Sequence, residues 1–284
     1  MTVFEAIILA IVEGLTEFLP VSSTGHMVIT QALMGIESTE YVKAFTVMIQ
    51  FGAILSVVVL YLKRFFRFEL PSDMWHGNHS KIRRFLSRFR FYFQLLVGLI
   101  PAVVLGLLFS DWVDEALGST WIIAVNLVVG GVIMLFIDKL IKNNMSGIVT
   151  YNNAFVIGLF QTIAMFLPGM SRSMCTIVGG MAVGLKRKVA AEFSFFLAVP
   201  TMLGASVYQL LKFWKNGNLS ILSDNIETLI IGNVVSFIVA MIAIKYFIKY
   251  LQKHGFFAFG IYRIIVGGAI ILMILLGMDL AIFQ

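Results

Sequence analysis

The sequence EGLTEFLPVSSTGH, from Glu13 to His26, interrupts an apolar stretch that covers residues 3–35. A second apolar stretch, residues 154–185, is interrupted in the same way by Pro168-Gly169-Met170-Ser171-Arg172-Ser173. Proline ends or kinks a helix, and the small polar residues beside it favour turns and helix caps. Each stretch therefore predicts two short helices joined by a break rather than one straight helix.

The composition is typical of a membrane protein. Of the 284 residues, 60% are hydrophobic and 13% are charged, whereas a soluble domain is about one quarter charged. A bilayer core of about 30 Å takes about 20 apolar residues per helix. We therefore predict an all-α polytopic membrane protein with one membrane domain, residues 1–284, and no soluble domain. The six predicted transmembrane helices are 44–62, 91–109, 121–138, 193–211, 229–248 and 259–278.

The charges between the predicted crossings indicate how the chain is oriented. Residues 63–90 carry eight lysines and arginines, whereas residues 110–120 carry three acidic residues and no basic one. By the positive-inside rule the first loop is cytoplasmic and the second lies outside. The later basic clusters fall on the cytoplasmic side only if both interrupted stretches turn back, so we predict two re-entrant helix-loop-helix pairs. The net charge of +6 thus reflects topology, and no nucleic-acid partner is expected.

The chain contains an internal repeat of two halves, residues 1–141 and 154–284. Each half has one re-entrant pair and three crossings, which is an odd number, so an inverted-topology repeat is expected. In such folds the binding site lies near the bilayer midplane, where the broken helices meet. A constant offset of 148 pairs Phe18 with Phe166, Pro20 with Pro168, Ser23 with Ser171 and Thr24 with Arg172.

Two carboxylates precede the first break. Glu13 and Glu17 are four residues apart, which places them on one face of a helix with Cβ atoms about 6 Å apart. Carboxylates at that distance repel each other unless they share a proton or a divalent cation. An ionisable side chain within the bilayer costs roughly 2.5 kcal/mol or more, so such a pair indicates function. We expect Glu13 and Glu17 to bind the metal, with Glu17 also taking part in catalysis.

The residues after the first break combine hydroxyls, a free helix start and a histidine. Backbone N–H groups at a helix start form an anion site, to which Ser22, Thr24 and Gly25 are expected to contribute. Ser23 lies three residues before His26, so we predict Ser23 as a nucleophile and His26 as its base or as the acid for the leaving group. Serine-rich helix starts also serve simply as caps, which is the alternative interpretation.

The second break brings an arginine. Arg172 in a glycine- and serine-rich turn suits two-pronged recognition of a phosphate, so we predict that it binds substrate during catalysis. Gln50, within a crossing, either lines the same cavity or bonds two helices together. Arg263 is expected at a membrane edge. The other predicted substrate-binding residues of this half are Ser171, Ser173 and Thr176.

The two motifs, residues 13–26 and 168–173, closely resemble the two signature motifs of the bacterial undecaprenyl-diphosphatase family of the bacitracin-resistance type. The resemblance extends over nearly the whole chain. It implies hydrolysis of the C55 isoprenoid carrier diphosphate to its monophosphate with Mg²⁺ or Ca²⁺, which recycles the carrier for peptidoglycan and other cell-wall polymers. It also implies a site on the periplasmic side of the plasma (inner) membrane, and it leaves His26 open as a direct nucleophile.

The leading hypothesis is thus a metal-dependent hydrolase that acts on a polyprenyl diphosphate among membrane lipids. The alternative is a polyprenyl-phosphate lipid flippase or an ion-coupled transporter, because inverted repeats and broken helices are also the architecture of secondary carriers. Release of phosphate in detergent would separate the two, since no compartments exist there. Glycines in the predicted crossings are compatible with a homodimer, or with internal packing alone.

Overall fold

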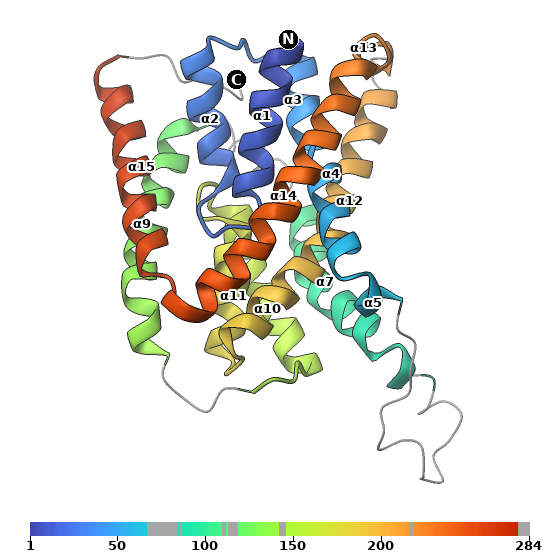
Figure 1. The fold of residues 1–284 in the computed structure, drawn as a ribbon, viewed down its shortest axis with the longest axis vertical. Helices are drawn as coiled ribbons and strands as arrows, with labels where there is room; N and C mark the ends of the chain where they lie inside the picture. The colour runs from blue at the N-terminus through green and yellow to red at the C-terminus, as the bar shows by residue number, and fades with distance from the viewer. Residues whose placement is uncertain are drawn as a thin grey trace.

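A computed structural model describes residues 1–66, 85, 87–109, 112, 119–141, 146–215 and 219–277. The regular secondary structure of these residues is helical, as predicted (Figure 1). Six helical segments are long and apolar enough to cross a membrane, so the chain is a multi-pass membrane protein and the six predicted crossings are confirmed. The six segments are α3 with α4 (Glu40–Met48, Gln50–Leu60), α7 (Arg90–Leu108), α9 (Thr120–Leu140), α12 (Arg187–Lys215), α14 (Ile226–His254) and α15 (Phe257–Leu275).

Four shorter helices form the two interrupted stretches. The first stretch folds as α1 (Val3–Thr16) and α2 (Ser23–Met34), and the second as α10 (Tyr151–Phe166) and α11 (Arg172–Ala182). The longest of the four, α10, has 16 residues, which at about 1.5 Å per residue is shorter than a bilayer core of about 30 Å. None of the four can therefore cross a membrane alone. Two further short helices are α5 (Leu62–Phe65) and α13 (Leu219–Ser223).

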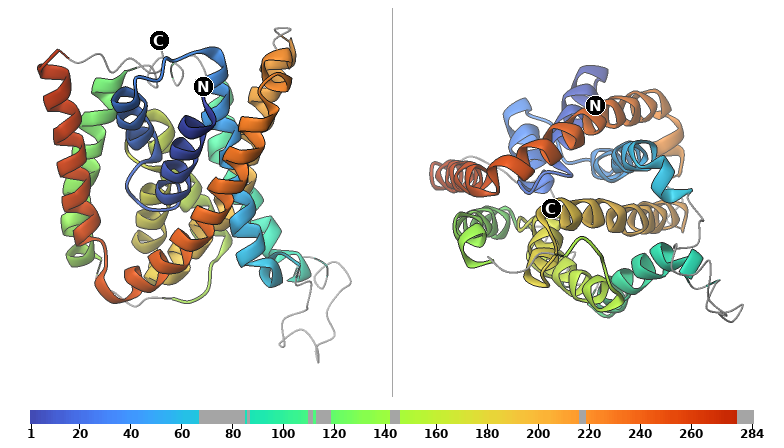
Figure 2. Two further views of the ribbon diagram at one scale, coloured as in Figure 1. Left: turned by 45° about the horizontal axis from the view of Figure 1, so that its top comes forward. Right: turned by 60° about the horizontal axis from the view of Figure 1, so that its bottom comes forward.

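The two broken pairs enter the molecule from opposite ends. In Figure 1, α1 and α2 occupy the upper half of the molecule and α10 and α11 the lower half, and Figure 2 shows the same arrangement after rotation. The breaks lie next to each other, because the Ser173 hydroxyl of α11 donates to the Leu19 carbonyl of the first break. The molecule thus brings two irregular segments together in its interior.

Glycines in the helices pack mainly within the chain. A Cβ atom on Gly158 of α10 would lie 2.1 Å from the carbonyl oxygen of Gly98 in α7, and one on Gly131 of α9 would lie 2.8 Å from that of Gly260 in α15. Only glycine permits such close approach of two backbones. These glycines therefore serve internal packing and give no support to a homodimer.

Part of the charge pattern lies outside the described residues. Arg67, Lys81, Arg83 and Arg84 of the basic loop, the acidic residues at 111–115, and Lys142 all fall in the undescribed segments. The predicted sidedness of the membrane protein accordingly stays a prediction.

Candidate functional site

Both breaks end in the same unusual way. Ser22 caps α2 and Ser171 caps α11, with φ angles of 72° and 73°. The Ser22 hydroxyl accepts from the Gly25 N–H at 3.4 Å, and the Ser171 hydroxyl accepts from the Met174 N–H at 3.3 Å. A positive φ is uncommon for residues other than glycine, and such strain clusters at functional sites. The two helix starts are thus built on equivalent, strained caps.

The caps correct the predicted pairing of the two motifs. The cap Ser22 lies two residues after Pro20, whereas the cap Ser171 lies three residues after Pro168. The caps are therefore 149 residues apart rather than 148. Arg172 therefore corresponds to Ser23 and not to Thr24, and these two residues are the first residues of α11 and α2.

A buried arginine fastens both breaks to the helices around them. Arg263 of α15 is 0% exposed, and its guanidinium donates to the carbonyl oxygens of Pro20 at 3.2 Å and Gly169 at 2.9 Å. It also donates to the carbonyls of Leu127 and Asn126, at 3.3 and 3.2 Å. The expectation that Arg263 lies at a membrane edge is wrong, because the side chain is buried and bonds four carbonyl oxygens, two in the breaks and two in α9.

Two further side chains complete this fastening. The Asn126 amide of α9 donates to the Pro168 carbonyl at 2.8 Å, and Ser173 Oγ donates to the Leu19 carbonyl at 2.7 Å. Ser173 is fully buried. With Arg263, these bonds account for carbonyl groups of both breaks, so the irregular backbone is held by side chains from three helices.

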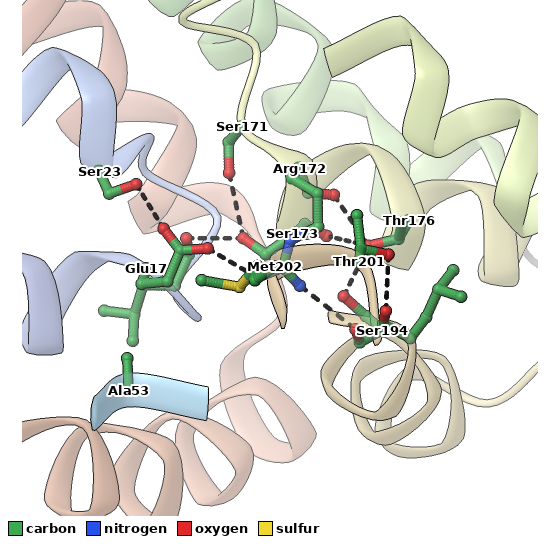
Figure 3. Close-up of polar contacts among 12 residues, drawn as sticks. Glu17, Ser23, Ala53, Ser171, Arg172, Ser173, Thr176, Ser194, Thr201 and Met202 are labelled. Atoms are coloured by element: carbon green, nitrogen blue, oxygen red, sulfur yellow. Dashed lines mark hydrogen bonds and ion pairs between the residues drawn. The ribbon is translucent and has the colours of Figure 1, made fainter. Parts of the chain in front are cut away.

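One carboxylate joins the two halves of the chain. Glu17 Oε1 lies 2.7 Å from Arg172 Nη2, and Glu17 Oε2 accepts from Ser23 Oγ at 2.6 Å (Figure 3). Only 9% of the Glu17 side chain and 15% of the Arg172 side chain are exposed. The structure thus gathers Ser23 and Glu17 of the first motif and Arg172 of the second into one cluster.

Arg172 is held from several directions. Its Nη1 donates to the Ser194 carbonyl at 3.2 Å, and Nη2 lies 3.2 Å from the Met202 sulfur (Figure 3). The guanidinium carbon also lies 5.7 Å from the centre of the Phe18 ring. Such contacts fix a planar, two-pronged donor in one orientation, which suits recognition of phosphate oxygens.

Glu13 lies next to Glu17 of this cluster. Its side chain is 1% exposed, its carboxyl interacts with that of Glu17, and its Oε1 has no hydrogen-bond partner. A buried carboxylate oxygen without a partner, next to a second carboxylate, fits a shared proton or a hard cation with oxygen ligands. Within the described residues, no group of three or more His, Cys, Asp or Glu side chains could hold a metal.

His26 does not contact Ser23 as predicted. Its Nδ1 lies 2.7 Å from the Ser22 carbonyl oxygen, and its Nε2 lies 2.7 Å from the Tyr262 hydroxyl. Ser23 donates to Glu17 instead. No hydrogen bond between Ser23 and His26 is thus described, and the predicted role of His26 as base or as the acid for the leaving group stays a prediction.

A comparison with known proteins shows the family of this chain. The family model described as bacitracin resistance protein BacA matches residues 6–269. The chain belongs to the BacA family. An undecaprenyl-diphosphatase of Porphyromonas gingivalis strain W83 is 59% identical over 283 residues, which cover 99% of this chain and all of that protein. The undecaprenyl-diphosphatases of Flavobacterium psychrophilum and Bdellovibrio bacteriovorus are 52% and 46% identical, with 96% and 99% of both chains covered.

The remaining predicted residues of this BacA family member have different surroundings. A Cβ atom on Gly25 would lie 2.5 Å from Leu127 Cδ1, so glycine allows α2 to approach α9. Thr176 is 0% exposed, and its hydroxyl is 2.6 Å from Ser194 Oγ. Within the described part of the chain, no hydrogen bond joins the side chain of Thr24 or of Gln50 to the cluster. The substrate-binding roles of these residues stay predictions.

Three residues that bond the breaks or the predicted site residues were missed by sequence reasoning. Asn126, Ser194 and Tyr262 all lie in apolar crossings, far along the chain from the motifs. Their only signal in the sequence is a polar group within a membrane helix, which by itself is as typical of packing as of function.

Proposed function

We propose that the protein hydrolyses undecaprenyl diphosphate to undecaprenyl phosphate and inorganic phosphate, and so recycles the lipid carrier for peptidoglycan and other cell-wall polymers. The observation that carries the proposal is the Glu17 carboxylate, which bonds a candidate nucleophile, Ser23, and a phosphate-binding candidate, Arg172. Relatives that share 46% to 59% of their residues over nearly the full length are named for this activity.

We further propose that residues 1–141 and 154–284 form an inverted-topology repeat in which α1–α2 and α10–α11 are re-entrant pairs. Support comes from the lengths of these helices and from their reciprocal packing. Helix α1 packs on α14 of the second half, and α10 packs on α7 of the first half. One helix of each broken pair thus packs on a crossing of the other half, and this reciprocal packing supports the proposed repeat.

The chemistry proposed for the cluster is nucleophilic. Ser23 Oγ attacks the terminal phosphorus and passes its proton to Glu17, while the bond from that phosphorus to the bridging oxygen breaks. Undecaprenyl phosphate leaves with the electron pair of that bond. Water then attacks the phosphoserine, inorganic phosphate departs, and Ser23 regains a proton. Ser23 is assigned as the nucleophile because it already donates to a carboxylate at 2.6 Å, whereas both nitrogens of His26 have other partners.

The phosphates would be held by cationic groups and helix starts. Arg172 would bind the terminal phosphoryl oxygens, on which charge is concentrated in the transition state. The starts of α2 and α11 would add their free N–H groups, with contributions from Thr24 and Gln50. Ser22, Gly25, Ser171, Ser173 and Thr176 would support this arrangement, since their described contacts lie within the protein.

A divalent cation, Mg²⁺ or Ca²⁺, would be held by Glu13 and Glu17. These residues fit a cation because Glu13 Oε1 is buried without a partner beside the second carboxylate. When bound, the cation would supply positive charge to the diphosphate oxygens. The Glu17 carboxylate itself fixes the position of Ser23 relative to Arg172, since it bonds both.

We place the protein in the bacterial plasma (inner) membrane, with the site open to the periplasmic side. The proposal rests on the excess of lysine and arginine in residues 63–90 and its absence from residues 110–120. The prenyl chain of the substrate would then remain among the membrane lipids.

Purified protein in detergent, supplied with a short-chain polyprenyl diphosphate and Mg²⁺ or Ca²⁺, tests the activity. We expect steady release of inorganic phosphate, and loss of most of it in Glu17→Gln, because the amide cannot accept the Ser23 proton or bind a hard cation. A flippase or transporter would release none. Turnover of Glu17→Gln near that of the unchanged protein would contradict the assigned site.

A further inference from the structure

A chain of hydrogen bonds links α15 to the strained cap of the first break. The Tyr262 hydroxyl lies 2.7 Å from His26 Nε2, and the two rings are nearly parallel, 10° apart, with centroids separated by 5.5 Å. His26 Nδ1 lies 2.7 Å from the Ser22 carbonyl oxygen. A carbonyl oxygen only accepts, so Nδ1 carries the ring hydrogen. In the neutral imidazole Nε2 is then the acceptor, and the Tyr262 hydroxyl donates to it.

The second break provides an internal comparison for this chain. In α11 the backbone N–H of Cys175 bonds the Ser171 carbonyl at 3.0 Å, as an ordinary first helical turn does. In α2 the corresponding bond, from the His26 N–H to the Ser22 carbonyl, is stretched to 3.4 Å. The imidazole of the same residue makes the shorter bond to that carbonyl. His26 thus replaces a weakened backbone bond with a side-chain bond, at a position where the other half has cysteine.

The short path from Pro20 to its cap explains why this support is needed. Between Pro168 and its cap the second break has two residues, one of them Gly169 with a φ of 92°, whereas the first has only Val21 between Pro20 and Ser22, so the second turns with less constraint. The first break has no glycine and must enter α2 through Ser22 directly. Tyr262 is well placed to brace it, since the next residue, Arg263, bonds the Pro20 carbonyl of the same break.

We propose that Tyr262 and His26 are positioning residues, which hold the Ser22 turn so that Ser23 faces Glu17, and that His26 does not carry the Ser23 proton. This inference rests on the proposed hydrolase function and names two residues that act on Ser23 through the turn before it. Ser23 donates to Glu17 and has no described contact with the imidazole, which is the arrangement that a positioning role requires.

Substitutions of His26 separate positioning from proton transfer. The amide of asparagine can place a donor near the Nδ1 position, whereas glutamine reaches toward the Nε2 position and alanine offers no donor. Removal of a residue that orients another functional group typically lowers activity by about 10- to 100-fold. We therefore expect kcat of His26→Asn within about 10-fold of the unchanged protein, and losses of kcat of about 100-fold in His26→Gln and His26→Ala. Equal inactivity of all three variants, or full activity of His26→Ala, would overturn the proposal.

A double-mutant cycle tests the part of Tyr262. Tyr262→Phe keeps the ring and removes the hydroxyl, and we expect kcat to fall about 10-fold with KM unchanged. In the His26→Asn background the same change should cost less than about twofold, because no Nε2 acceptor remains. Tyr246→Phe, at an exposed tyrosine of α14, is the matched control. A rise in KM alone, or the same loss in both backgrounds, would show that Tyr262 acts on substrate or independently of His26.

A measurement without substrate keeps the inference separate from the proposed activity. The chain has four histidines, so ¹⁵N-histidine spectra in detergent can be assigned with His26→Asn. We expect His26 to carry its hydrogen on Nδ1, and its Nε2 signal to shift in Tyr262→Phe but not in Tyr246→Phe. A ring hydrogen on Nε2 would contradict the proposed series of hydrogen bonds from Tyr262 to the Ser22 carbonyl. If the unchanged protein releases no phosphate, the proposed hydrolase function is wrong, while these spectra still decide whether Tyr262 bonds His26 as described.

Discussion

Glu17 is the residue on which the cluster depends, because each of its two oxygens has a different partner. One oxygen orients Arg172 and the other accepts from Ser23. A phosphate bound between them would compete for the same donors. Arg172 can serve both ligands, since a guanidinium has five donors and the Ser194 carbonyl and Glu17 leave some of them free. A lysine at this position has no such planar array.

Arg172→Lys is therefore expected to lower kcat/KM by about 100-fold, a loss of roughly 2.7 kcal/mol in transition-state stabilisation. The charge is kept, but the two-pronged contact with phosphate oxygens and the fixed contact with the Ser194 carbonyl are lost. Steady-state phosphate release over a series of substrate concentrations measures the change in kcat/KM. Thr24→Ser is the control, because serine keeps the hydroxyl that is proposed to contribute at this position, and full activity of Arg172→Lys would contradict the composite site.

At the scale of the elements, the sequence predicted the crossings and both breaks, because hydropathy and proline act locally. The register after the breaks was not predictable from the serines alone. Ser22 and Ser23 offer two alignments with Ser171, and only the caps decide between them. Arg263 was misplaced for a related reason: spacing predicts which residues share a helix face, but not which carbonyls a distant helix brings to it.

Close helix contact gives a test at this scale. Gly158→Ala in α10 would place a Cβ atom 2.1 Å from the Gly98 carbonyl oxygen of α7. Overpacking of this kind costs about 1–3 kcal/mol, so we expect a lower unfolding midpoint in detergent. Gly204→Ala in α12 is the matched control, since no atom lies within 4 Å of its added Cβ. There alanine should stabilise the helix by about 0.5–1 kcal/mol. A midpoint of Gly158→Ala equal to that of Gly204→Ala would show that α10 and α7 do not meet as described.

At the scale of the whole molecule, the site exists only where the two halves meet. Glu17 and Ser23 come from one half and Arg172 from the other, and Arg263 of α15 bonds one carbonyl in each break. The buried position of the cluster follows from this arrangement, because the two breaks meet inside the protein. The membrane face to which the cluster opens depends on the charges of the loops and not on the packing of the helices.

Cysteine labelling decides the orientation. Ser119 caps the start of α9, and Gly147 follows its other end, where an added Cβ meets no atom within 4 Å. In a Cys175→Ala background, which removes the only native cysteine, we expect Ser119→Cys to react with a membrane-impermeant maleimide in intact cells. Gly147→Cys should react only after the membrane is permeabilised, because Lys139 and the basic residues at 186–188 flank that end of the molecule. The opposite pattern would turn the α1–α2 end toward the cytoplasm, and the site would then meet its lipid diphosphate from the inner leaflet.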